Sequence, residues 1–265
     1  MSSLSATIEG IGFWCNGLPD WDAARAYAQG AGLPDDAPAR PSPQVLAPNE
    51  RRRAPESVAV ALEVALAACI DAQHDPATLA SVFASTHGDL AITDYMCSTL
   101  VEDPRALSPT RFHNSVHNAA AGYWTIGNRC VRATTAISAF DASFAQGLLE
   151  ALLQLAAGEP AVLLVGYDTA SPGPLAPISH SEGTLGGALV LSGAGHIGKP
   201  RLRVTLVDGN LQPARGALAR RAAGNAMAQM LPVFDALARD GARGSEESVI
   251  LRAGAGRALT VRICR

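Results

Sequence analysis

The chain has 265 residues, 48% hydrophobic and 17% charged, which is enough to bury the core of one large α/β domain or two small ones. A formal net charge of −3 excludes the strong overall attraction to nucleic acid or anionic membrane that a basic chain has. The longest apolar run, Val58–Ile70, contains Glu63 and is too short to span a bilayer, and the N-terminus lacks a secretory signal pattern.

Five cysteines are scattered through the chain, and none forms a CxxC pair. An odd number without close spacing fits reduced thiols better than a disulfide framework. The composition therefore predicts a cytoplasmic protein without membrane insertion and without a nucleic-acid partner. The five are Cys15, Cys69, Cys97, Cys130 and Cys264.

The first half of the chain contains loops, buried helices and short strands. Residues 17–49 are rich in Pro, Gly, Asp and Ala and read mostly as loop, because proline fixes φ and lacks an N–H. The helix predicted at 56–73 has few polar positions, so we expect it to be buried on most sides. The predicted elements are the strand Thr7–Phe13, the helices Trp21–Gln29 and Glu56–Gln73, the strand Leu79–Ser85, and the helices Leu90–Leu100 and Asn118–Arg129.

In the second half, apolar strands alternate with helices, which favours a layered α/β fold. The predicted elements are the strand Val131–Ser138, a helix from Asp141 or Ser143 to near Gly158, the strands Ala161–Gly166, Gly187–Leu191 and Leu202–Val207, a helix Ala214–Arg239 broken at Gly224 or near Pro232, and the strands Ser248–Arg252 and Ala258–Ile263.

The most informative stretch is Thr134–Ala145, which predicts a strand, a tight turn and a helix. Ser143 and Gln146 have the spacing of a capping box at the start of that helix. A strand-to-helix turn of this kind commonly presents a nucleophile in α/β enzymes. Here the turn contains alanine and no cysteine.

Two further motifs are weak. His113 and His117 are four residues apart, as zinc ligands can be, but they fall in a loop or at a helix cap without an evident third ligand. Gly193–Gly198 matches GxGxxG, but Lys199-Pro200 and a strand follow in place of the helix that a dinucleotide site needs. We therefore expect a structural role for the histidines, a loop at the glycines, and neither metal nor cofactor.

Four segments share an order and spacing with a known superfamily. They are the basic run Glu50–Arg53, the stretch Phe112–Gly122 (FHNSVHNAAAG), the strand end Leu163–Asp168 and the glycine-containing segment Glu182–Leu191. Together with Ser143–Ala151 (SFAQGLLEA), they resemble the β-ketoacyl synthase superfamily over roughly residues 4–208. The chain looks most like the short ketosynthase-like proteins called chain length factors in bacterial aryl polyene clusters.

This resemblance implies a thiolase-like α/β/α fold made mainly of the first half of a ketosynthase. We expect residues 1–265 to form a single domain, with 209–265 as a C-terminal extension of a structure that the resemblance does not give. Half of such a layered sheet would leave an apolar face uncovered, and a large apolar face marks a partner site. The resemblance further implies a heterodimer with a full-length ketosynthase, formed through Val131–Ser138 and Asn118–Arg129.

The sequence departs from the superfamily at its reactive groups. Alignment from Ala145 puts Ala139 at the position of the nucleophilic cysteine, with Ser138 as the alternative one residue away. A methyl group cannot attack a thioester. The superfamily also uses two histidines from its second half, and residues 209–265 contain none. The resemblance therefore implies a catalytically silent subunit.

The resemblance also implies which residues face other proteins. Phe140, Asp141, His117 and Asn118 are expected near the partner's acyl tunnel, although Phe140 would otherwise be an ordinary core residue. Arg51, Arg52 and Arg53 are candidate contacts for an acyl carrier protein or its pantetheine phosphate. The other interpretation of this run, a solvated cluster beside Glu50 and Glu56, is the favoured one.

Two other functions remain open from the sequence. The chain is a stand-alone acyltransferase or thioesterase if Ser138, or a cysteine such as Cys130, acts with a histidine base. It is a docking module for a carrier protein if it binds one without affecting product length.

Overall fold

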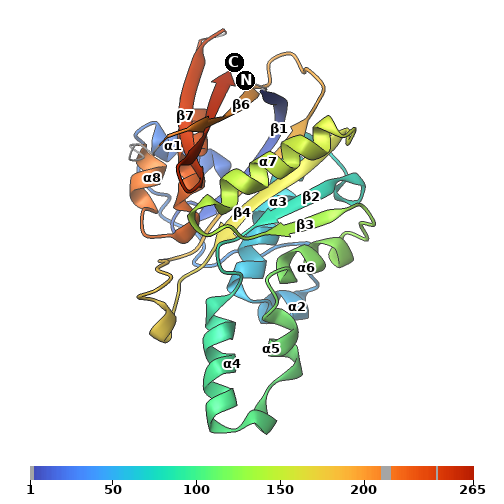
Figure 1. Ribbon diagram of the computed structural model, residues 1–265, viewed down its shortest axis with the longest axis vertical. Coiled ribbons are helices and arrows are strands. Elements are labelled where there is room, and N and C mark those ends of the chain that lie inside the picture. The colour runs from blue at the N-terminus through green and yellow to red at the C-terminus, as the bar shows by residue number, and fades with distance from the viewer. Residues whose placement is uncertain (1–2, 210–215, 243) are drawn as a thin grey trace.

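The computed structural model describes residues 3–209, 216–242 and 244–265, and strands from both ends of the chain join one sheet. The strands are β1 (Leu4–Cys15), β2 (Ala80–Ala84), β3 (Thr134–Ile137), β4 (Ala161–Asp168), β5 (Leu185–Ser192), β6 (Arg201–Asp208), β7 (Glu246–Gly254) and β8 (Arg257–Cys264). Their spatial order is β3-β2-β4-β5-β1-β6-β8-β7 (Figure 1).

The strands β3, β2 and β4 are parallel, and the remaining neighbours are antiparallel. Since β1 and β4 are both antiparallel to β5, the strands β1, β2, β3 and β4 all end on the same side of the sheet. This side is called the carboxyl end below, and the opposite side is called the amino end. Residues that follow these four strands are therefore brought together.

Helices cover both faces of the sheet, so the predicted α/β/α layering is confirmed. On one face, α3 and α6 pack over a cluster that includes Trp14, Phe83 and Trp124. On the other, α7 and α9 pack over a cluster that includes Phe144 and Phe234. The helices are α1 (Trp21–Ala28), α2 (Pro48–Arg53), α3 (Glu56–Ala72), α4 (Leu90–Glu102), α5 (Pro109–Asn114), α6 (Ala119–Gly127), α7 (Ser143–Ala156), α8 (Ala217–Arg221) and α9 (Leu231–Ala238).

Close packing of α3 on β1 depends on glycine. A Cβ atom added at Gly12 would collide with the carbonyl oxygen of Val64, and one added at Gly10 would collide with that of Ala68. The helix backbone therefore lies directly on the strand, which only glycine allows at these two positions.

The expectation of an uncovered apolar face is wrong, because the C-terminal segment covers it. Every residue of β4 and β5 is buried. The ring of Phe234 on α9 lies 5.5 Å from that of Phe13 on β1 and 6.4 Å from that of Phe144 on α7. Strands β7 and β8 extend the same sheet beyond β6. The C-terminal segment of the chain thus provides this cover.

Three local predictions need correction. The short helices α2 and α5 were not predicted, although each starts at a proline, the residue favoured at a first helical position. The helix predicted at 214–239 is three pieces, α8, the 3₁₀ helix Ala226–Met230 and α9, with residues 214 and 215 outside the described part. Gln146 closes no capping box, because its Nε2 donates to the carbonyl of Ala253, 2.6 Å away.

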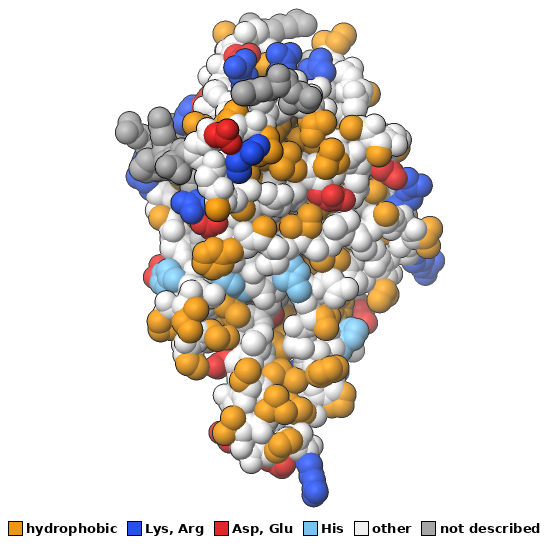
Figure 2. All heavy atoms as spheres, viewed as in Figure 1, with side chains coloured by type: hydrophobic (Ala, Val, Ile, Leu, Met, Phe, Trp, Pro, Cys, Tyr) orange, Lys and Arg blue, Asp and Glu red, His pale blue; other side chains and the backbone are white. Residues whose placement is uncertain are grey.

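Helices α4 and α5 form an arm that projects at the end of the molecule opposite the two termini (Figure 1). No residue of α4 is buried. Hydrophobic side chains are spread over this arm (Figure 2), among them Leu100, Val101 and Phe112. None of the described helices has the length and apolar character needed to cross a membrane.

Candidate functional site at the carboxyl end of the sheet

The turn between β3 and α7 has a strained backbone at Phe140. Its φ is +52°, in the left-handed region that a bulky residue rarely adopts, and its side chain is 61% exposed. The Oγ of Ser143 donates to the carbonyl of Phe140 (2.7 Å) and accepts from the N–H of Ala139 (3.0 Å). The hydroxyl of Thr86 donates to the same carbonyl (3.3 Å). Side-chain hydrogen bonds thus hold the turn in place.

A strained strand-to-helix turn is the geometry that presents a nucleophile in α/β enzymes. The residue in this conformation is Phe140, one position after Ala139, whose φ is −144°. The geometry therefore favours Phe140 over Ala139 as the residue at the nucleophile position. Neither side chain can attack a thioester.

Among the described residues, no base contacts the side chains of Ser138, Cys130 or Cys15. The Oγ of Ser138 donates to the carbonyl of Thr86, 3.0 Å away. The Sγ of Cys130 is buried and donates to the carbonyl of Leu79, before β2 and so at the amino end of the sheet. Cys15 is only 4% exposed, and burial raises the pKa of its thiol to about 11 although Arg221 opposes the shift. A thiol with that pKa is not a nucleophile at neutral pH.

Asp168, at the end of β4, fixes the loop that lies beside this turn. Its carboxylate accepts hydrogen bonds from the Oγ of Ser85 (2.7 Å) and from the N–H groups of Thr86 (3.0 Å) and His87 (3.3 Å). Complete burial raises the pKa of the Asp168 carboxyl, and the hydrogen bonds from Ser85 and Thr86 oppose that shift. The carboxyl group therefore holds residues 85–87 in one conformation.

Two imidazole rings lie next to this loop. The Nε2 of His117 is 2.9 Å from the carbonyl oxygen of Ser85. The Nε2 of His87 is buried and has no hydrogen-bond partner among the described residues. Burial lowers the pKa of His87, the charge of Asp168 opposes this and the nearby His117 adds to it. His87 is therefore held as a neutral ring at neutral pH.

Sequence reasoning missed His87 and gave Asp168 no role, because the histidines that it singled out were His113 and His117. A signal was present: Ser85-Thr86-His87 follows one buried strand and Asp168 ends another. Parallel strands bring the residues at their carboxyl ends together.

The structure brings some of the expected residues to this turn and separates others. His117 and Phe140 both contact the loop at residues 85 and 86. Asp141 pairs with Arg252 of β7, with 2.6 Å between Oδ2 and Nη1. Asn118 lies at the start of α6, where its side chain makes no capping hydrogen bond.

The three arginines of α2 do not act as one patch. The guanidinium of Arg51 donates to the carbonyl of Leu46, and that of Arg52 to the side chain of Asn49. Arg53 lines a cavity of about 640 Å³ with Arg111 of α5.

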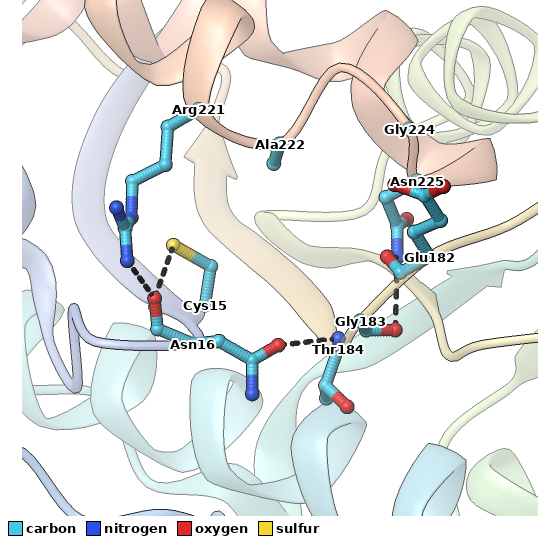
Figure 3. Close-up of a pocket in the computed structure, with 9 residues that line it drawn as sticks. All are labelled: Cys15, Asn16, Glu182, Gly183, Thr184, Arg221, Ala222, Gly224 and Asn225. Atoms are coloured by element: carbon cyan, nitrogen blue, oxygen red, sulfur yellow. Dashed lines mark hydrogen bonds between the residues drawn. The ribbon is translucent and has the colours of Figure 1, made fainter.

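A polar pocket of about 300 Å³ lies at the same end of the sheet, where β1 ends and β5 begins (Figure 3). Arg221 reaches across it to the carbonyl oxygen of Asn16, 2.5 Å away. The Nδ2 of Asn225 bonds the carbonyls of Glu182 (3.0 Å) and Asp168 (3.2 Å). The C-terminal segment is thus tied to the ends of β4 and β5.

The structure gives no support for a metal site at His113 and His117 or for a nucleotide site at Gly193–Gly198. His113 faces the ring of Tyr123 whereas His117 contacts Ser85, so the two do not converge. Within the part of the chain that the structure describes, no group of three or more His, Cys, Asp or Glu side chains could hold a metal ion. Gly193–Gly198 forms the loop between β5 and β6, as predicted.

Comparison with solved structures finds the same fold in several ketosynthase assemblies. The ketosynthase ApeO in complex with its chain length factor ApeC from Xenorhabdus doucetiae matches with a TM-score of 0.75 and 23% identity, covering 99% of this chain and 100% of that one. The ishigamide ketosynthase/chain length factor matches at 0.71 and 16%, covering 98% and 99%. The AntDE:AntF complex, a type II polyketide ketosynthase with its acyl-carrier protein, matches at 0.73 and 12%, covering 99% of both. The thiolase-like fold is confirmed.

No curated protein sequence matches the chain. The sequence profile described as "Beta-ketoacyl synthase, N-terminal domain" matches residues 21–248, which is most of its length. That span includes the strained turn, the loop at residues 85–88 and the helices of the C-terminal segment. The chain therefore belongs to the β-ketoacyl synthase family, through its N-terminal domain.

Proposed function

We propose that this protein is a catalytically silent ketosynthase-like subunit, a chain length factor, that pairs with an active β-ketoacyl synthase. The observation that carries the proposal is the phenyl ring of Phe140 at the turn where the family presents its nucleophile. A member of the family without a thiol there has no means of covalent acyl transfer.

Strand β3 supports the proposal of a partner. It lies at one edge of the sheet, with β7 at the other, and the carbonyls of Ala133 and Ile137 accept hydrogen bonds from the N–H groups of Ser81 and Ser85. Because bonding alternates along a parallel strand, the backbone groups of Thr134 and Ala136 point outward and are free to pair with another chain.

Exposed apolar side chains surround this edge. Val131 is 96% exposed and Ile126 is 77% exposed, and Leu153 of α7 and Phe140 are also exposed. Exposed apolar groups beside an unpaired strand fit a protein interface better than a solvent-facing surface. The solved complexes of similar fold include two described as a ketosynthase with its chain length factor.

Phe140 is the residue that we propose limits the length of the product. It stands on a fixed turn next to the proposed interface, and the loop at residues 85 and 86 contacts both Phe140 and His117. In a heterodimer its ring would bound the acyl tunnel of the active partner. Because the sequence resembles chain length factors of aryl polyene clusters, we propose a product of the aryl polyene type. The exposed Arg52 and Arg53 remain candidates for contact with an acyl carrier protein.

Reconstitution tests the proposal. The chain is co-expressed with a full-length β-ketoacyl synthase encoded beside it, and product lengths are read by mass spectrometry. We expect the two to co-purify, condensation only in the complex, and longer products from Phe140→Ala. Ile70→Ala, which removes an exposed side chain from the far end of α3, should leave length unchanged.

The isolated chain is tested in parallel against acyl- and malonyl-thioesters. Condensation by the isolated chain, or a covalent acyl adduct on it, would overturn the proposal in favour of a stand-alone acyltransferase or thioesterase. Normal complex formation with unchanged length in Phe140→Ala would indicate a docking role.

A further inference from the structure

A third hollow lies between the C-terminal segment, α1 and the loop that joins β5 to β6. Its volume is about 490 Å³, within the usual range for small-molecule sites. The loop leaves β5 at Ser192, which pairs with Ala161 at the start of β4. The loop wall of the hollow is therefore at the amino end of the sheet, away from Phe140.

The floor of this hollow is apolar. Trp21 of α1 and Leu237 of α9 line it, and both are only partly buried. The ring of Trp21 is fixed by Phe234, with 6.0 Å between ring centroids. At the rim, Ile197 is 93% exposed. An apolar floor with an exposed apolar rim is built to accept a hydrocarbon or aromatic group.

Arginines stand around the rim. Arg25, Arg239 and Arg265 line the hollow, together with Asp240. Arg25 pairs with Asp240 at 3.0 Å, and Glu247 pairs with both Arg239 and Arg265. Each pair uses only part of a guanidinium, which has five N–H donors. Donors therefore remain for an added anion.

We propose that this hollow binds a small monocarboxylate with an apolar body, such as a medium-chain fatty acid. The apolar part would lie on Trp21 and Leu237, and the carboxylate would meet the guanidinium groups of Arg25 and Arg239. A planar carboxylate fits the fork of an arginine, so it can use guanidinium N–H groups that the existing ion pairs leave over. This site is separate from the turn at Phe140 and does not depend on the function proposed above.

Tryptophan fluorescence can detect such binding. Trp14 and Trp124 are fully buried, so Trp21 is the ring that a ligand would reach. Sodium octanoate is titrated into the full chain, with acetate and octan-1-ol as controls. We expect saturable binding of octanoate with a Kd of about 1 mM or tighter, at least tenfold weaker binding of octan-1-ol, and no saturation with acetate.

A charge placed at the rim distinguishes this pocket from general surface binding. Ile197→Glu adds a negative charge beside the proposed carboxylate and removes no buried contact. We expect it to weaken octanoate binding at least tenfold. The matched variant is Ile178→Glu, at another exposed isoleucine, and it should bind within about twofold of wild type. Arg25→Glu supplies a second rim variant if Ile197→Glu fails to fold by circular dichroism.

Three results would overturn the proposal. They are an absence of saturable octanoate binding, equal affinity for octan-1-ol, and equal loss of binding in the Ile197 and Ile178 variants.

Discussion

The two edges of the sheet, at β7 and at β3, differ in what surrounds them. On the β7 side, a hairpin and the helices α8 and α9 come from the chain's own C-terminal segment and bury the apolar face. On the β3 side, the last strand is four residues long, none of its residues is buried, and exposed apolar side chains stand beside it. The chain therefore supplies its own core on the β7 side, whereas exposed apolar side chains lie at the β3 edge of the sheet.

This difference separates stability from assembly. Side chains on the β7 side should control whether the chain folds, whereas those on the β3 side should control what the folded chain binds. Each prediction below tests that separation, starting with the largest expected effect.

Phe234→Ala should destabilise the protein strongly, because it empties the centre of the cover that α9 provides. Phenylalanine to alanine changes in a core cost about 3–5 kcal/mol. The free energy of unfolding, measured by urea denaturation, should fall by that amount. Phe112→Ala on the exposed arm is the control and should change it by less than about 1 kcal/mol. Similar losses in the two variants would mean that the C-terminal segment is not the core we describe.

Ala136→Pro should block assembly and leave the fold intact. The N–H that proline removes points away from β2, so only pairing with another chain is lost. We expect complex formation with the β-ketoacyl synthase to weaken about 10- to 100-fold by calorimetry. Ala136→Gly keeps the N–H and should bind as wild type does. Unaltered affinity in the proline variant would remove β3 from the interface.

Glu9 lies where the two sides of the sheet join, since β1 pairs with β5 over most of its length and with β6 near its start. Its carboxylate contacts the Nε2 atoms of His74 (2.5 Å) and His196 (2.8 Å). Burial alone would raise the pKa of Glu9, but hydrogen bonds from Ser192 and His74 and the charges of both histidines outweigh it, so the pKa is lowered.

A lowered carboxyl pKa stabilises the folded state above the unfolded pKa, and the stabilisation disappears as pH falls through the folded pKa. Glu9→Gln should therefore cost about 1–2 kcal/mol near pH 6, and the difference from wild type should shrink toward about pH 3. Urea denaturation across this range measures it. A gap that widens on acidification would contradict the assigned direction.

The smallest effect is expected where the C-terminal hairpin contacts the turn at Phe140. Arg252 and Asp141 form an ion pair at 2.6 Å, but the side chains are 47% and 35% exposed. A double-mutant cycle with Arg252→Ala and Asp141→Asn should give a coupling of about 0–1 kcal/mol, reduced by salt. A larger coupling would show that the hairpin stabilises the turn as well as the core.

The order of elements was largely predictable because continuous apolar strands alternate with helices. The short helices α2 and α5 were hidden because proline at 48 and 109 suggests a loop, although it is compatible with a first helical turn. The packing of α9 over the sheet could not be predicted. An apolar segment indicates that it is buried, but not which face of the sheet it packs against.

The sequence predicted a turn between the strand and the helix, and the structure has its left-handed residue at Phe140. No glycine marks its left-handed position, so nothing in the sequence separates Phe140 from Ala139. The cluster of His87, His117 and Asp168 required the strand order, because its members come from segments up to 81 residues apart. Parallel strands meet at one end of a sheet, but their order is a tertiary property.

The left-handed backbone at Phe140 has a mechanical consequence. Three hydrogen bonds hold the backbone here, two at the carbonyl of Phe140 and one at the N–H of Ala139. The ring of Phe140 can therefore move only by rotating about its own two side-chain torsions. A side chain held in this way keeps a fixed position and does not move aside when another group presses against it. If the ring does bound a growing chain, the limit that it sets should be one defined length and not a broad distribution.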